Sequence, residues 1–271
     1  MTIPYAMNNA ERFESPAFKT RLTSMLKLDF YRLFHTPNFY IFLLIAALIP
    51  AMIIGTSGMD ASGGAGNAAY AAPASIEIAN AWQLIESAGG SAAAGNPLDF
   101  GGYTNINMLF IFAGLMMAIF VAHDYSSGFV KNIFTVHSKK IDYVISKSAV
   151  GIFSGAGMIV TYVLGTALAG LFSGKSFDVN VGGLILCLLS KAFLMGVFCS
   201  LFLGIAVFFK NKLWLTIVFT FLLGMMFYPA ASVATLDSTG ITLLISLAAG
   251  IIGALVFGTV STLFLKKRDL V

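Results

Sequence analysis

The chain has 271 residues, of which 58% are hydrophobic and only 10% are charged. A soluble domain of this length would carry about 25% charged residues, and the mean hydropathy of +0.88 also indicates lipid as the main solvent. The net charge of +4 is too small to indicate a nucleic-acid partner. Six spans would use roughly 120 residues, so we expect one membrane domain and no soluble catalytic domain.

Residues 1–38 are expected to form a cytoplasmic N-terminal segment. Within it, residues 17–35 place apolar side chains at helical spacing with basic residues among them. A basic amphipathic helix of this kind lies in the membrane interface. Pro37 ends the helix and turns the chain into the bilayer.

Six apolar runs follow, each long enough to suggest a membrane span. The fourth has 29 residues, more than a straight crossing needs, so we expect it to be tilted or broken near Lys191 or Gly196. The sequence predicts an all-α polytopic membrane protein with six transmembrane helices in residues 39–264 and a cytoplasmic tail at 265–271. The runs cover residues 39–57, 105–122, 148–172, 181–209, 213–231 and 241–264.

The basic residues predict the orientation of these spans. Fourteen of the sixteen Lys and Arg residues fall on one side, whereas the other side holds only Lys175, and Lys191 lies within a span. Because cytoplasmic loops carry an excess of Lys and Arg, we expect both termini to be cytoplasmic and the protein to lie in a bacterial inner membrane. The fourteen are Arg12, Lys19, Arg21, Lys27, Arg32, Lys131, Lys139, Lys140, Lys147, Lys210, Lys212, Lys266, Lys267 and Arg268.

The largest outer loop, residues 58–104, contains one stretch with a helical pattern. Ile78, Trp82 and Ile85 share one helical face. We expect a short helix at 75–88 that rests on the outer surface with Trp82 at headgroup level. It is either an outer gate over a pathway or a tethered surface loop.

The long inner loop, residues 123–147, is too apolar for a purely solvated connection. Phe129, Ile133 and Phe134 can form one face of a short helix under the membrane. Such a helix either docks a soluble partner or touches only lipid headgroups.

Catalytic motifs are missing from the sequence. The string at 170–176 resembles a phosphate-binding loop but has three residues between its glycines instead of four, and no strand precedes it. No span holds paired carboxylates, and neither HExxH nor GxSxG occurs. We therefore expect no catalytic residue, cofactor or metal ion in this chain.

Three features inside the spans need an interpretation. Lys191 either faces a polar cavity or an anionic part of a substrate, or it snorkels outward. Cys187 and Cys199 are expected to be buried free thiols, because twelve residues of helix would separate them by about 18 Å. Small residues at four-residue spacing, as at Gly157, Thr161 and Gly165, indicate close helix packing within the chain or at a dimer seam.

These features together resemble the membrane subunits of type-2 ATP-binding-cassette (ABC) exporters. The likeness extends from about residue 17 to the end of the chain, and Asp124 stands where that family often has glutamate. It rests on the six spans, the entry helix ending in Leu33-Phe34-His35-Thr36-Pro37, the segment Asp124-Tyr125-Ser126-Ser127-Gly128 followed by Lys131 and Ser138-Lys139-Lys140, and the closing Phe264-Leu265-Lys266-Lys267-Arg268.

The resemblance implies a permease subunit that is not itself an enzyme. Two such subunits, identical or paralogous, would form the pathway in membrane lipid as a dimer, and a separate ABC ATPase subunit holding ATP and Mg would sit beneath each. The small size and large first outer loop are most similar to permeases for peptide-antibiotic (lantibiotic) export or self-protection. The inner loop would be the coupling helix, with Asp124, Gly128, Phe129, Lys131, Ile133, Phe134, Lys139 and Lys140 as its site residues.

Other functions remain open on the sequence. A permease of this kind could instead export lipids, drugs or ions. A secondary transporter or channel would work without an ATPase, and a membrane anchor or sensor would not transport at all. Secondary carriers often show internal repeats and buried ionisable groups, whereas this chain shows no convincing repeat and only Lys191 within a span, which favours the ABC subunit.

Overall fold

The computed structural model describes residues 17–56, 78, 80–85, 106–135, 139–210 and 212–267. The regular elements of these residues are helices, which confirms the all-α prediction. In chain order they are α1 (Phe18–Phe34), α2 (Pro37–Thr56), the 3₁₀ helix η1 (Ala81–Leu84), α3 (Met108–Ser126), α4 (Phe129–Thr135), α5 (Lys140–Phe172), α6 (Val181–Phe209), α7 (Leu213–Ala231) and α8 (Gly240–Lys267).

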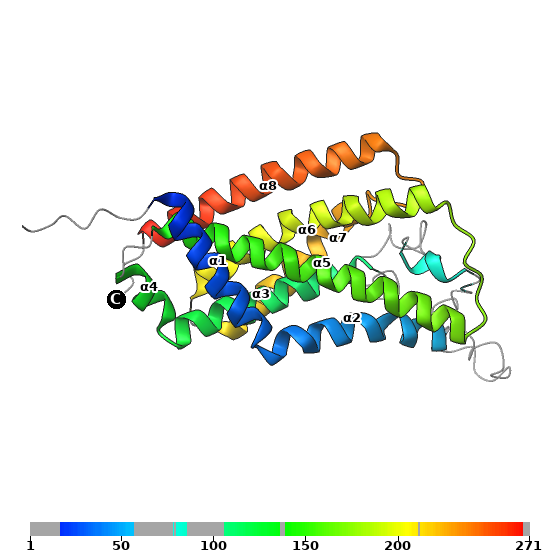
Figure 1. The fold of residues 1–271 in the computed structure, drawn as a ribbon, viewed down its shortest axis with the longest axis horizontal. Coiled ribbons are helices and arrows are strands. Elements are labelled where there is room, and N and C mark those ends of the chain that lie inside the picture. The colour runs from blue at the N-terminus through cyan, green and yellow to red at the C-terminus, as the bar shows by residue number, and fades with distance from the viewer. Residues whose placement is uncertain are drawn as a thin grey trace, which may run out of the picture.

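The long helices form an elongated bundle with different structures at its two ends. Helices α2, α5, α6 and α8 run along the long axis, and α1 lies across one end (Figure 1). Helix α4 and the end of α8 lie at the same end as α1, whereas η1 lies at the opposite end (Figure 1). We call these the α1 end and the η1 end.

Five of the described helices, α2, α3, α5, α6 and α8, are long and apolar enough to cross a membrane. The chain is therefore a multi-pass membrane protein. Helix α7 is equally apolar in character but too short, over its described residues, to count among them. The sixth crossing thus stays a prediction.

Two helices differ from their predicted runs. Helix α6 is one continuous helix of 29 residues, so of the two expected alternatives the break near Lys191 or Gly196 is excluded and a tilted helix stays a prediction. Its length of about 43 Å exceeds the roughly 30 Å of the hydrocarbon core. Helix α5 begins at Lys140 rather than at residue 148, which shortens the inner connection between spans.

Small residues on α5 and α8 bring neighbouring helices of the same chain close together. A Cβ on Gly165 of α5 would clash with the backbone oxygen of Ala47 in α2. A Cβ on Gly250 of α8 would lie 2.7 Å from the backbone oxygen of Phe193 in α6. These glycines serve packing within the chain.

Cys187 and Cys199 both lie in α6 and are buried, which confirms the predicted burial of both thiols.

Candidate functional site at the α1 end

Helix α1 presents two different faces. Met25, Asp29 and Leu33, spaced four residues apart, are buried against the bundle. Phe18 and Tyr31 remain exposed, as expected for an amphipathic helix that also touches lipid. An acid in the middle of the buried face requires a partner, because an isolated buried charge is very costly.

Asp29 belongs to a cluster of four charged side chains from three helices, which we call the charge cluster: Asp29 and Arg32 of α1, Asp124 of α3 and Lys147 of α5. The Nζ atom of Lys147 lies 2.7 Å from Oδ1 of Asp29 and 2.6 Å from Oδ2 of Asp124. Nη2 of Arg32 lies 2.6 Å from Oδ1 of Asp124. Asp29, Asp124 and Lys147 are fully buried, and the two acids balance the two cations.

Hydroxyl groups add one hydrogen bond to each of the two acids. The Ser146 hydroxyl donates to Oδ2 of Asp29 at 2.6 Å. The Tyr143 hydroxyl donates to Oδ2 of Asp124 at 3.0 Å. Both donors come from the first turns of α5, as Lys147 does. The start of α5 is therefore the element that supplies most partners to α1 and α3.

A second ion pair joins the same two helices. Nε of Arg21 in α1 lies 2.9 Å from Oδ2 of Asp142 in α5. Ion pairs therefore attach α1 to α5 at two places, Arg21 and Asp29. These pairs connect the cross-lying helix directly to a candidate span.

The predicted inner helix is present as α4, and its apolar side packs on the chain itself. The Phe129 ring lies 3.9 Å from Cζ of Arg32, which is a close cation–π contact. The Phe134 ring meets the Tyr143 ring edge to face, with centroids 5.7 Å apart. What α4 leaves exposed is its polar side, including Lys131.

The remaining residues assigned to the inner loop surround α4. Gly128 has a φ of 72° directly after α3, a conformation that favours glycine and redirects the chain into α4. Ile133 is half-buried and Lys139 is exposed. Nζ of Lys140 donates to the backbone oxygen of Leu265 at 2.6 Å, which ties the start of α5 to the end of α8.

Lys191 lies far from this site. Its Nζ donates to Oδ1 of Asn107 at 2.6 Å and to the backbone oxygen of Ala231 at 3.2 Å. The Asn107 amide in turn donates to the hydroxyl of Ser232 at 3.2 Å. The lysine is fully buried, so within one chain it connects α6 to the start of α3 and the end of α7.

The outer segment at 75–88 differs from the predicted surface helix over the residues that the structure describes. Residues 81–84 form a 3₁₀ helix, and Asn80 caps it by accepting from the backbone N–H of Trp82 at 3.0 Å. Ile78 and Ile85 are buried instead of lying on the surface, because the segment packs against α5, where the Tyr162 hydroxyl donates to the backbone oxygen of Leu84. The rest of 75–88 lies outside the described residues.

The pairing inside the charge cluster was not predicted from the sequence. Asp29 and Arg32 were taken only as parts of a basic amphipathic helix, and Lys147 only as part of the cytoplasmic excess of charge. One local signal was available. Asp29 lies four residues from both Met25 and Leu33 on one helix face, which indicates a buried acid that needs a cation.

The fold and this site define a multi-pass membrane protein. Ion pairs of the charge cluster attach α1, which lies across one end of the bundle, to the spans, and the short helix α4 packs on Arg32 and Tyr143 beside them. A family model described as "ABC-2 family transporter protein" matches residues 25–227, from α1 to α7 and including the whole charge cluster. The chain belongs to this family and is a permease of the ABC-2 type. No match was found among curated proteins or among solved structures.

Proposed function

We propose that the chain is the permease subunit of an ATP-driven bacterial exporter in the inner membrane. Two copies, or one copy and a paralogue, form the pathway, and an ABC ATPase subunit carrying ATP and Mg lies beneath each. Family membership supports an ATPase partner in general. The fourteen basic residues on one side support cytoplasmic termini.

The contacts of α7 support a sixth crossing. Near its start, Phe219 packs on Phe209 at the end of α6, with centroids 4.8 Å apart. At its other end, the backbone oxygen of Ala231 accepts from Lys191, beside the start of α3. The 19 residues of α7 would therefore connect the α1 end of the bundle with the η1 end.

The observation that carries the proposal is the attachment of α4 to the charge cluster. A force on α4 reaches α1 through Phe129 and Arg32, and it reaches α5 through Phe134 and Tyr143. The buried pair of Asp29 and Lys147 then holds α1 to α5. Because separating a buried ion pair is strongly unfavourable, these elements would move as one body when an ATPase displaces α4.

The test alters the exposed side of α4 and leaves the charge cluster intact. We expect Lys131→Glu with Asn132→Glu to abolish co-purification of the ATPase in mild detergent and ATP-dependent export, with an unchanged melting temperature. Lys175→Glu, at the η1 end, serves as the control and should change neither. Wild-type chain that brings down no ATPase, or a double variant that binds it normally, contradicts the proposal.

For the substrate we propose peptide antibiotics of the lantibiotic kind, exported or cleared from the membrane. The small size of the chain and its long first outer loop support this choice through the family resemblance. Ile78, Trp82 and Ile85 would belong to an outer gate at the η1 end, and Lys191 would face the pathway once α3, α6 and α7 separate. Cells with the complete transporter should survive higher lantibiotic concentrations than cells lacking it, and equal survival argues against this substrate.

A further inference from the structure

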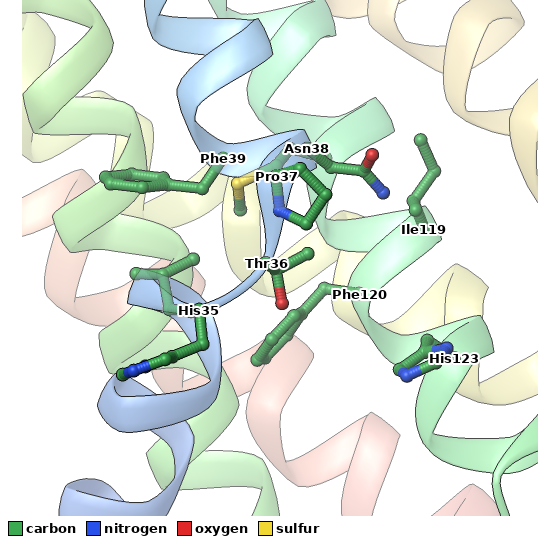
Figure 2. Close-up of a pocket in the computed structure, with 10 residues that line it drawn as sticks. His35, Thr36, Pro37, Asn38, Phe39, Ile119, Phe120 and His123 are labelled. Carbon is green, nitrogen blue, oxygen red and sulfur yellow. The ribbon is translucent and has the colours of Figure 1, made fainter.

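A cavity of about 310 Å³ lies between the connection of α1 to α2 and the second half of α3 (Figure 2). Its apolar wall includes Met116, Ile119 and Phe120 of α3. Its polar side includes Asn38 and His123. The cavity therefore combines an apolar surface with hydrogen-bonding groups, and its volume is at the lower end of the range for ligand sites.

The polar groups on this cavity are available to a ligand. Among the described residues, neither the Asn38 amide nor the His123 ring has a hydrogen-bond partner. Figure 2 shows Asn38 on α2 and His123 on α3, both among the residues that surround the cavity. The amide can donate two hydrogen bonds and the imidazole at least one.

The cavity lies where the polar and apolar parts of the chain meet. Helix α2, a candidate span, begins at Pro37, and the amphipathic helix α1 ends directly before it. The last turn of α3 changes from apolar residues to His123, Asp124 and Ser126. This boundary corresponds to the headgroup level of the bilayer, so a lipid molecule can reach the cavity without leaving the membrane.

We propose that this cavity binds the phosphate-bearing headgroup of a membrane phospholipid. Asn38 and His123 donate to the phosphate oxygens, and the beginning of an acyl chain packs against Met116 and Ile119. Phe120 connects this site with the charge cluster, because its ring lines the cavity and also lies 4.2 Å from Nζ of Lys147. The proposal depends on neither the ATPase partner nor the substrate.

Native mass spectrometry of the full chain in detergent tests the proposal with dioctanoyl phosphatidylglycerol as the probe. We expect binding that dioctanoylglycerol, which lacks the phosphate, does not reproduce. Asn38→Leu combined with His123→Leu should weaken binding by about tenfold or more, since hydrogen bonds to charged groups are lost. Asn132→Leu removes the same amide from the exposed side of α4 and should bind the probe like the wild type.

Three outcomes overturn the proposal. If the double variant binds phosphatidylglycerol as tightly as the wild type, the lipid lies elsewhere. If dioctanoylglycerol binds equally well, the site does not recognise phosphate. If inorganic phosphate displaces the lipid at equal concentration, the ligand is a soluble phosphate. Ile119→Trp fills the cavity without removing a polar group and should also abolish binding, which keeps the test decisive if the double variant misfolds.

Discussion

Lys147 contacts two carboxylates at once, Oδ1 of Asp29 at 2.7 Å and Oδ2 of Asp124 at 2.6 Å. All three side chains are buried, so none is solvated by water. Replacing an entire buried ion network with apolar residues is often nearly neutral, whereas removing one member leaves an unpaired charge. The contribution of Lys147 to the free energy of unfolding therefore depends on which of its partners remain.

We predict that Lys147→Met lowers the free energy of unfolding by about 3–5 kcal/mol, because two carboxylates then share only Arg32. Thermal unfolding followed by fluorescence-detected size exclusion in detergent measures the change. Lys139→Met, an exposed lysine eight residues earlier in the sequence, is the control and should have almost no effect.

A second substitution separates charge balance from packing. Adding Asp29→Asn to Lys147→Met restores an equal number of acids and cations in the charge cluster, so we expect it to recover part of the lost stability. A double variant that is less stable than Lys147→Met would show that the buried charges are not what holds α1 to α5.

Lys191 allows a similar prediction at the η1 end. Lys191→Met leaves Oδ1 of Asn107 and the backbone oxygen of Ala231 without this donor, so we expect a loss of about 1–3 kcal/mol in thermal unfolding. A variant that keeps wild-type stability but loses transport would point instead to the pathway role.

At the scale of elements, helices could be predicted from periodicity and contacts between helices could not. The spacing of Phe129, Ile133 and Phe134 predicted α4, and the apolar stripe of residues 17–35 predicted α1. The partners of Asp29 are 117 and 118 positions away, a distance at which no local pattern shows pairing. The apolar face of α4 therefore looked free for a soluble partner or for lipid headgroups, whereas it packs on Arg32 and Tyr143.

The same limit applies to α6. Its run of 29 residues is longer than a straight crossing needs, which suggested either a tilted helix or a break near Lys191 or Gly196. The structure supplies Asn107 and the backbone oxygen of Ala231 as partners, and the helix stays continuous. These partners belong to segments far from Lys191 in the sequence, so no local pattern could show that the lysine is accommodated within a continuous helix.

The close contact of α5 with α2 leads to a prediction for an element pair. Gly165→Ala places a Cβ against the backbone oxygen of Ala47, and a backbone atom cannot move aside as a flexible side chain can. We expect α2 and α5 to separate slightly and the free energy of unfolding to fall by about 1–3 kcal/mol. Thermal unfolding in detergent measures this change.

Gly55→Ala is the matched control for Gly165→Ala. Nothing lies within 4 Å of a Cβ at Gly55, and alanine favours the helix by about 1 kcal/mol over glycine. The free energy of unfolding of Gly55→Ala should therefore equal or exceed that of the wild type. If both variants lose the same stability, the close approach of α2 and α5 is not the cause.

At the scale of the whole molecule, the arrangement of the bundle leads to a testable expectation about membrane topology. Lys212 and Asp237 are both exposed and flank α7. Contacts at the two ends of α7 reach opposite ends of the bundle, so the two residues should lie on opposite sides of the membrane. This expectation requires α7 to cross the bilayer, and the excess of basic residues assigns the cytoplasmic side to Lys212.

We predict that Asp237→Cys reacts with a membrane-impermeant maleimide in intact cells and that Lys212→Cys reacts only after the membrane is permeabilised. Both are introduced into a background with Cys187→Ala and Cys199→Ala, which removes the two native thiols, both of them buried. Labelling is quantified by mass shift on a gel, and export activity confirms that each variant is folded. Lys131→Cys should follow Lys212→Cys, because α4 lies at the α1 end (Figure 1). Equal labelling of residues 212 and 237 in intact cells would mean that α7 does not cross, and an odd number of spans would then separate the two ends of the chain.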